Sequence, residues 1–134
     1  MNRKIRQGFL VLIAVQTLHS VEEFIFKFYE VFPPMRLLYR DAPSLAGPAF
    51  IIANVVLVMV GLICLLRWVR PARRGARVVV WAWVGGEAFN VIAHCAWAIH
   101  VRGYNPGMMT VFWFVPVVAY LSYLLRRAPA HAGA

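Results

Sequence analysis

Ionisable residues interrupt two long apolar stretches of this sequence at helical spacing. In the first stretch, Glu22 and Glu23 follow His19 by three and four positions, so a helix can project all three side chains toward one side. Each ionised group at the centre of a bilayer costs about 2.5 to 3.5 kcal/mol on insertion scales. A membrane helix is therefore not expected to carry this group unless the protein uses it.

The second stretch carries a matching polar face, because Glu87, Asn90 and His94 occur at spacings that share one side of a helix. Two histidines and several carboxylates in an apolar enclosure favour general acid/base catalysis, since Glu22 and Glu23 resist ionising together and one of them keeps its proton and acts as the acid. Isomerisation, cyclisation or hydration of a lipophilic small molecule needs little more. The predicted catalytic residues are His19, Glu22, Glu23, Glu87, Asn90 and His94.

The same residue types also fit two other classes of protein. His19, Glu22, Glu87 and His94 offer two imidazoles and two carboxylates, which suit a divalent iron, zinc or manganese ion acting on a lipid. The order His-x-x-Glu is the reverse of the order found in ferritin-like bundles. A proton-coupled transporter or lipid-binding membrane protein would also contain buried Glu and His chains. These alternatives stay open at the level of the sequence.

The composition predicts one all-α membrane domain that positions these residues. Of the 134 residues, 62% are hydrophobic and 14% are charged, far from the composition of soluble domains. Four apolar segments approach the length of about 20 residues that a bilayer requires, at 8–28, 45–68, 78–101 and 108–125. We predict a four-transmembrane-helix bundle over residues 1–127 and a disordered tail over 128–134.

The basic residues indicate the orientation of the chain. The net charge of +9 does not indicate nucleic-acid binding, because the basic residues cluster at the ends of apolar segments, where they anchor loops at a lipid bilayer. One side would hold ten: Arg3, Lys4, Arg6, Arg67, Arg70, Arg73, Arg74, Arg77, Arg126 and Arg127. The other would hold four: Lys27, Arg36, Arg40 and Arg102. This excess predicts that both termini are cytoplasmic.

Depth in the bilayer brings the polar groups of different spans together. With a rise of about 1.5 Å per residue, His19, Glu87 and His94 come to a similar level, somewhat outside the midplane. Asn54 of the second span reaches the same level, and Trp97 lies near it. We expect these faces to meet inside the bundle. The predicted substrate-binding residues are Asn54, Trp97, Tyr104, Pro106 and Gly107.

Two of these placements have competing interpretations. Glu23 either joins His19 or turns outward and pairs with Lys27, which follows it by four positions. The stretch Tyr104 to Gly107 is either a tight outer turn or a lid whose tyrosine hydroxyl reaches a carboxylate. For the lid, the loop between the last two spans must fold inward.

Three motifs in this order resemble those of the HXXEE family of bacterial membrane proteins: His19-Ser20-Val21-Glu22-Glu23, Asn90-Val91-Ile92-Ala93-His94 and Tyr104-Asn105-Pro106-Gly107. The resemblance implies a multi-pass protein of the bacterial inner (plasma) membrane and an enzymatic function without an assigned reaction. It also implies functional roles for the motif residues, but not for Glu87, whose role rests on helix geometry. The oligomeric state is left open.

Overall fold

The computed structural model describes residues 1–128 of the chain. Its elements are α1 (Arg3–Ile25), α2 (Phe28–Val31), α3 (Pro33–Leu38), η1 (Pro43–Leu45), α4 (Ala46–Cys64), η2 (Leu65–Val69), α5 (Ala76–Val101) and α6 (Met108–Arg127). No strand occurs in this part of the chain. Four stretches are long and apolar enough to cross a membrane: Arg3–Ile25, Pro43–Val69, Ala76–Val101 and Met108–Arg127. The predicted fold is confirmed, whereas the predicted tail lies outside the described residues except for Ala128.

α1 begins before residue 8 and ends before residue 28, the bounds predicted from its apolar length. The helix begins earlier because the Asn2 side chain caps it by accepting a hydrogen bond from the Lys4 amide at 3.0 Å. It ends at Ile25, because Lys27 adopts a left-handed conformation with φ 55°. The third span, by contrast, ends at Val101 as predicted.

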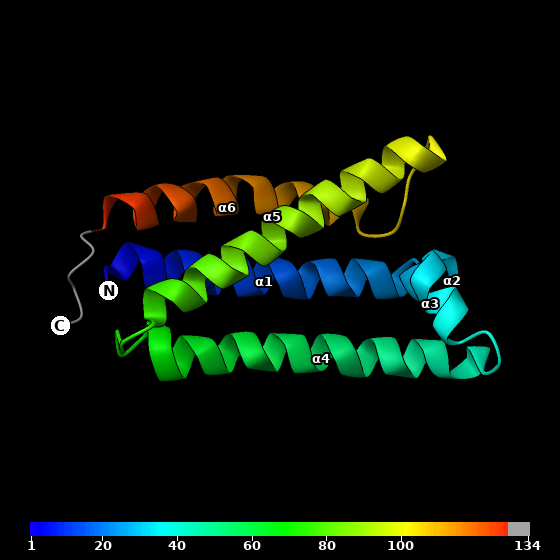
Figure 1. Cartoon of the computed structure of the whole chain (residues 1–134), viewed down its shortest axis with the longest axis horizontal. Coiled ribbons are helices and arrows are strands. Elements are labelled where there is room, and N and C mark those ends of the chain that lie inside the picture. The colour runs from blue at the N-terminus through cyan, green and yellow to red at the C-terminus, as the bar shows by residue number, and fades with distance from the viewer. Residues whose placement is uncertain (129–134) are drawn as a thin grey trace.

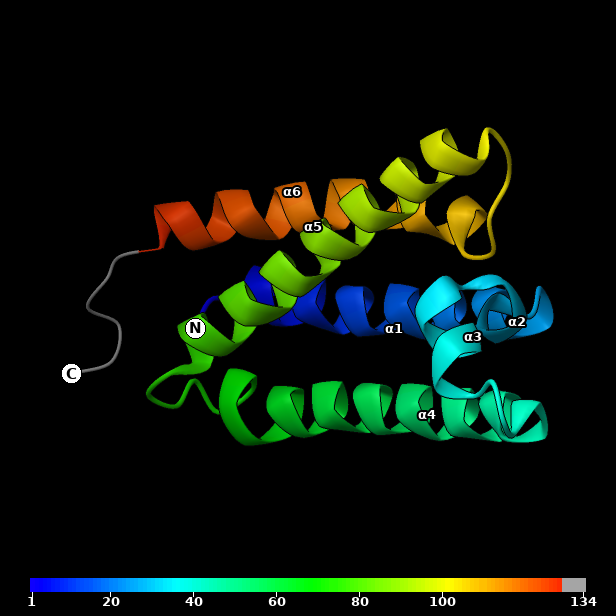
Figure 2. The ribbon, with the colours of Figure 1, turned by 45° about the vertical axis from the view of Figure 1, so that its right-hand side comes forward.

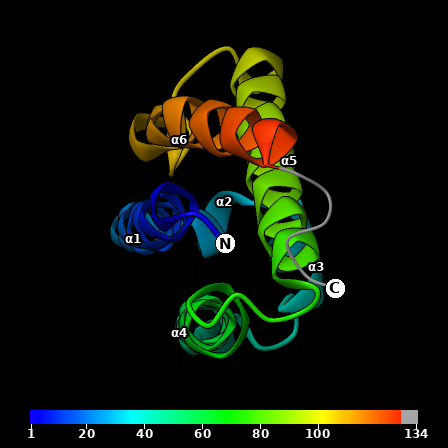
Figure 3. The same cartoon turned by 90° about the vertical axis from the view of Figure 1, so that its left-hand side faces the viewer.

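The four long helices form a bundle that is closed on one side and splayed on the other. α1 lies between α6 and α4, and α5 packs on α6 (Figures 1 and 3). α5 starts beside the end of α4 and then diverges from it along its length (Figure 2). The N-terminus and the end of α6 lie at the same end of the bundle (Figure 1). Which side of the membrane this end faces stays a prediction.

The interior changes character along the bundle axis. At the end that holds the N-terminus and the end of α6, the helices α1, α5 and α6 bury apolar side chains, and we call this region the apolar half: Ile5, Phe9, Leu12, Val80, Val84, Leu121 and Leu125. The opposite region buries polar side chains, and we call it the polar half: Gln16, His19, Ser20, Glu22, Glu23, Glu87, His94 and Asn105. Both halves draw on the same helices.

The outer surface of the bundle is apolar. Large exposed side chains include Ile52 on α4, Phe89 on α5 and Trp113 on α6, which are 64%, 72% and 67% exposed. In the most apolar part of the second span, only 11% of the residues are buried inside the protein. A surface of this kind is stable in lipid and not in water, so the chain is a membrane-embedded protein.

Candidate functional site

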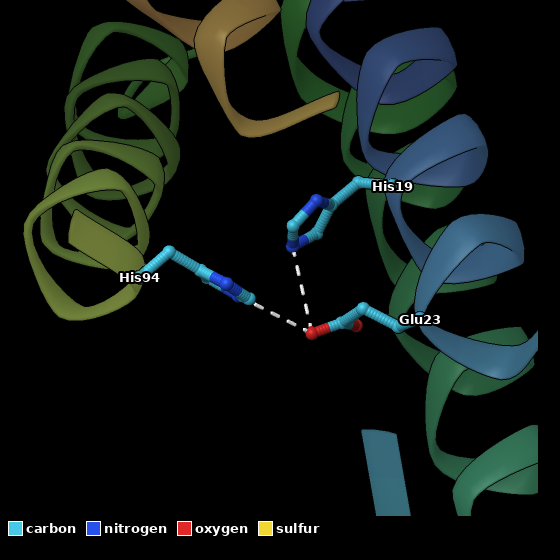
Figure 4. Close-up of side chains that lie close together, drawn as sticks. All are labelled: His19, Glu23 and His94. Atoms are coloured by element: carbon cyan, nitrogen blue, oxygen red, sulfur yellow. Dashed lines mark ion pairs between the residues drawn. The ribbon is translucent and has the colours of Figure 1, made fainter. Parts of the chain in front are cut away.

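Two histidines from different helices converge on one carboxylate in the polar half. The Nε2 atoms of His19 and His94 lie 3.6 Å and 3.3 Å from Oε1 of Glu23 (Figure 4). The two imidazole centroids are 4.8 Å apart and the rings are nearly perpendicular. All three residues are buried, with at most 7% of their surface exposed. We call these three residues the His–Glu–His cluster.

The orientation of Glu23 follows from the end of α1. Because the helix stops at Ile25, Lys27 does not lie one turn beyond Glu23 on the same face. Lys27 pairs instead with Glu30, at 3.1 Å between Nζ and Oε1. The alternative in which Glu23 turns outward to Lys27 is therefore wrong, and Glu23 shares the interior with His19.

Glu22 faces a different helix from its neighbour Glu23 and caps the start of α6. It accepts hydrogen bonds from the Met109 amide at 3.0 Å and from the Thr110 amide at 2.7 Å. The Thr110 hydroxyl also donates to this carboxylate. A negative charge at a helix N-terminus offsets the partial positive charge of the free amides. Because Gly107 at the N-cap position has no side chain to do this, Glu22 supplies the missing cap.

The loop between α5 and α6 folds inward over the cluster. Asn105 is 2% exposed, and its Oδ1 lies 2.8 Å from Nδ1 of His94 while its side-chain amide donates to the His94 carbonyl at 3.1 Å. Gly107 has φ 92°, and a Cβ there would lie 2.7 Å from Cε1 of both His19 and His94. Only glycine fits at this position, both for its backbone conformation and for the space available.

Tyr104 ties the same loop to α1. Its hydroxyl donates to Glu22 at 2.7 Å, as the inward-folded lid requires. Partial burial of the hydroxyl and its hydrogen bond to Glu22 raise the pKa of Tyr104 above its usual value, so the group stays a donor at physiological pH. The loop is therefore more than a tight outer turn, although its part in binding a substrate stays a prediction.

A second polar group of the interior runs from α5 through α1 to α4. The Gln16 side chain lies between Glu87 and Ser20, with its amide atoms 3.0 to 3.1 Å from both. Ser20 Oγ donates to Asn54 Oδ1 at 2.6 Å. Asn90 donates to Glu87 at the longer distance of 3.5 Å. We call the row Glu87, Gln16, Ser20 and Asn54 the polar row.

The hydrogen bonds of the polar row bear on the protonation state of Glu87. Because the Asn54 amide nitrogen donates to the Phe50 carbonyl at 3.0 Å, the Asn54 oxygen takes the single hydroxyl hydrogen of Ser20. Gln16 must then donate to Ser20, which turns the Gln16 oxygen toward the Glu87 carboxyl. The opposite amide orientation would leave Gln16 and Asn54 competing for one Ser20 hydrogen. In this pattern the Gln16 and Glu87 oxygens meet at 3.0 Å and a proton on Glu87 joins them, whereas the opposite amide orientation places the Gln16 nitrogen at that distance as a donor to Glu87.

A cavity of about 730 Å³ joins the His–Glu–His cluster to the polar row. Its wall comes from α1, α4, α5 and the region of α2, and it is mostly apolar and aromatic. The lining includes Phe28, Phe32, Phe50, Leu57, Trp83, Phe89 and Trp97, together with the polar residues Gln16, His19, Glu23, Asn54, Glu87, Asn90 and His94. Trp97 packs at 5.5 Å from the rings of both Phe28 and Phe32. The structure thus brings most of the predicted site residues to one cavity.

Glu22, Tyr104, Pro106 and Gly107 do not line the cavity. Glu22 and Tyr104 hold the loop behind the cluster, and Pro106 is buried within that loop. Among the residues that sequence reasoning did not select, Gln16, Ser20, Asn105 and Thr110 make the hydrogen bonds described above. Two of them had a usable signal. Asn105 lies inside the Tyr104 to Gly107 motif, and Gln16 precedes His19 by one helical turn.

A family profile described as "Protein of unknown function with HXXEE motif" matches residues 10–121 of the chain. This range contains all four helices that could span a membrane, at least in part, and every residue of the cluster and of the polar row. No curated protein and no solved structure matches the chain.

Proposed function

We propose a function from the site itself, because the chain belongs to the HXXEE family, whose function is unknown. The protein is an integral membrane enzyme that performs proton-transfer chemistry on a lipophilic small molecule. One observation carries this proposal: the Glu87 carboxyl and the His–Glu–His cluster line the same apolar cavity. We infer from the hydrogen bonds of Gln16, Ser20 and Asn54 that Glu87 holds a proton. Acid and base groups whose environments keep them in opposite protonation states are typical of such active sites.

The cavity supports a lipophilic substrate. Its volume of about 730 Å³ lies in the range of small-molecule sites, and aromatic side chains form much of its wall. Its lining residues come from α4 and α5, which diverge along their length (Figure 2). We expect a molecule dissolved in the bilayer to reach the cluster between these two helices.

The two groups divide the reaction between them. Glu87 gives its proton to the substrate, and an unprotonated imidazole of the cluster removes a proton elsewhere on the molecule. For isomerisation or cyclisation the two transfers balance, so the product has the mass of the substrate. For hydration, the cluster activates a water molecule and the product gains the mass of water.

A comparison of lipid extracts tests this function. Membranes that contain the wild-type protein are compared by untargeted mass spectrometry with membranes that contain Glu87→Gln, which keeps the shape of the side chain but gives no proton. We expect a compound that is consumed, and an isomer or hydrate that accumulates, only with the wild type. His100→Ala, at an exposed position near the end of α5, serves as the control and should behave like the wild type.

Equal conversion by Glu87→Gln and the wild type would exclude Glu87 as the proton donor. A compound that copurifies with both proteins but is not converted by either would favour a lipid-binding protein or transporter over an enzyme.

The proposed location is the bacterial inner membrane with both termini in the cytoplasm. It is supported by the ten basic residues on the side of the termini against four on the other. A reporter that is active only in the cytoplasm, fused after Arg127, should be active. A periplasmic reporter that is active at the same point would reverse the orientation.

A further inference from the structure

We propose that the His–Glu–His cluster binds a divalent transition-metal ion. The ligand atoms would be Nε2 of His19, Nε2 of His94 and a carboxylate oxygen of Glu23, which all lie within 4.8 Å of one another. The set differs from the four ligands that the sequence favoured, because Glu22 points to α6 and Glu87 belongs to the polar row. The argument rests on which nitrogen of each histidine carries a hydrogen.

For His94, the side-chain amide of Asn105 determines which ring nitrogen carries the hydrogen. Asn105 donates through its side-chain nitrogen to the His94 carbonyl at 3.1 Å, which fixes the amide orientation. The Asn105 oxygen is therefore the atom that lies 2.8 Å from Nδ1 of His94. Since this oxygen can only accept, Nδ1 carries the hydrogen. The neutral imidazole then has its lone pair on Nε2, which faces Glu23.

For His19, the Thr110 hydroxyl determines which ring nitrogen carries the hydrogen. Nδ1 of His19 lies 2.9 Å from Oγ1 of Thr110. The single hydroxyl hydrogen of Thr110 is directed to Glu22, or at 3.3 Å to the Gly107 carbonyl, and both of these are acceptors. In either case Thr110 accepts from His19, so Nδ1 carries the hydrogen here as well. The lone pair of His19 also lies on Nε2.

Three acceptor atoms thus face one another with no donor between them. Nε2 of His19 is fully buried and has no hydrogen-bond partner among the described residues. The distances of 3.6 Å and 3.3 Å to Glu23 exceed the roughly 2.7 to 2.9 Å of a charge-assisted hydrogen bond. They are close to the separation of about 3.3 Å between two ligands that each lie about 2.0 to 2.1 Å from one tetrahedral ion.

A single proton satisfies fewer of these three acceptor atoms than a metal ion does. One proton on Nε2 of His94 gives a donor toward Glu23 but leaves Nε2 of His19 without a partner. A cation between the three atoms satisfies all of them together. The hydrogen bonds from both Nδ1 atoms to side-chain oxygens are also the outer contacts by which proteins orient metal-binding histidines.

The surroundings leave one side of the proposed site open. Gly107 packs against Cε1 of both rings, and Phe114 packs on the His19 ring at 5.3 Å between centroids. The cavity lies on another side and is lined by all three ligands. Two imidazoles and one carboxylate with a free position suit Zn²⁺ in a hydrolytic site or Fe²⁺ in an oxygen-using site. With an ion bound, the lone pairs of both imidazoles are occupied, so water at the free position of the ion would serve as the base in their place, and Glu87 stays free to donate its proton.

Metal binding by the purified protein tests this proposal without any substrate. The full chain is purified in mild detergent with an affinity tag that does not chelate metals, stripped with a chelator and titrated with Zn²⁺ and with Co²⁺. We expect about one ion per chain by elemental analysis, and visible absorption bands for bound Co²⁺ that Zn²⁺ removes. A folded wild-type protein that binds neither ion at the cluster overturns the proposal.

Matched variants locate the ion. His94→Ala and Glu23→Gln should each weaken Zn²⁺ binding by at least about 100-fold, whereas His100→Ala on the same helix should leave it unchanged. Asn105→Ala removes the partner of a ligand and not a ligand, so a loss of about 10- to 100-fold is expected. Wild-type affinity in both ligand variants overturns the proposal even if an ion is bound. Should these variants not fold, stabilisation of the wild type by Zn²⁺ in thermal unfolding still decides whether the ion binds.

The experiments can refute the metal site and the enzymatic function independently of each other. Stoichiometric binding that depends on the cluster, without conversion of any lipid, would contradict the proposed function and leave the metal site intact. Conversion of a lipid by a protein that binds no ion would do the reverse.

Discussion

The two halves of the bundle are held together by different forces, although α1 supplies both. In the apolar half, Phe9 and Leu12 are fully buried and pack against α5 and α6. Packing of this kind tolerates small shifts, because dispersion contacts have little directionality. In the polar half, His19 and Glu22 are fixed by hydrogen bonds to the start of α6. The first half stabilises the fold, and the second half fixes the positions of reactive atoms.

Gly107→Ala should give the largest effect on the polar half. An added Cβ meets both imidazole rings at 2.7 Å, and a residue other than glycine at φ 92° is strained. We expect Zn²⁺ affinity to fall more than about 100-fold, beyond the loss caused by removing a ligand's hydrogen-bond partner. The control is Gly85→Ala, because a Cβ at Gly85 meets nothing within 4 Å. A Zn²⁺ affinity within about threefold of the wild type would contradict the close packing of Gly107 against both imidazole rings.

Phe9→Ala should act on the apolar half alone. The expected loss of stability is about 3 kcal/mol, near the lower end for a buried phenylalanine, because lipid gives part of the transfer free energy back. Unfolding in mixed detergent measures this loss, and Leu10→Ala, at a position that is 50% exposed, is the control. Zn²⁺ affinity per folded molecule should not change. A loss of affinity as large as that of Gly107→Ala would show that the two halves are not independent.

Glu22→Gln should loosen the polar half by about 2 kcal/mol, because it removes the negative charge that the amides of Met109 and Thr110 contact. Hydrogen exchange should rise in peptides that cover residues 104–110 and stay constant in peptides of the apolar half. Glu30→Gln, at an exposed carboxylate, is the matched control. Unchanged exchange at 104–110 would refute the capping role of Glu22.

Tyr104→Phe should have the smallest effect, about 1 kcal/mol, because it removes one hydrogen bond and leaves the other donors to Glu22 in place. Thermal unfolding of this variant, beside Tyr123→Phe as the control, measures the loss. If lipid conversion falls strongly while stability does not, the Tyr104 hydroxyl acts on the substrate and its role is not confined to holding Glu22.

Much of the fold and part of the site could be predicted from the sequence. The four spans follow from apolar length, and the convergence of α1 and α5 follows from depth and the need to shield polar side chains from lipid. The assignment of the two neighbouring carboxylates could not be predicted. At about 100° per residue, Glu22 and Glu23 lie about 60° and 40° to either side of His19. Only the positions of α6 and α5 decide which one joins the histidines.

The inward fold of the loop between α5 and α6 could not be predicted from the sequence either. Asn105 stands in a run whose composition fits an ordinary turn, and Thr110 looks like a normal residue of an apolar span. Their roles depend on side chains that are distant in sequence, at His94 and Glu22. The polar row was missed for a similar reason, because Gln16 has no charge and its neighbour Glu87 lies on another helix.

The cap that Glu22 provides also constrains how the protein is made. The carboxylate and the Thr110 amide that binds it are separated by 88 positions in the chain. At about 5 to 20 residues per second, α1 leaves the ribosome roughly 4 to 18 s before its partner exists. During that time Glu22 has no helix N-terminus to cap, and Glu23 has no partner on another helix until His94 of α5 is made. The polar half therefore assembles only when synthesis is nearly complete.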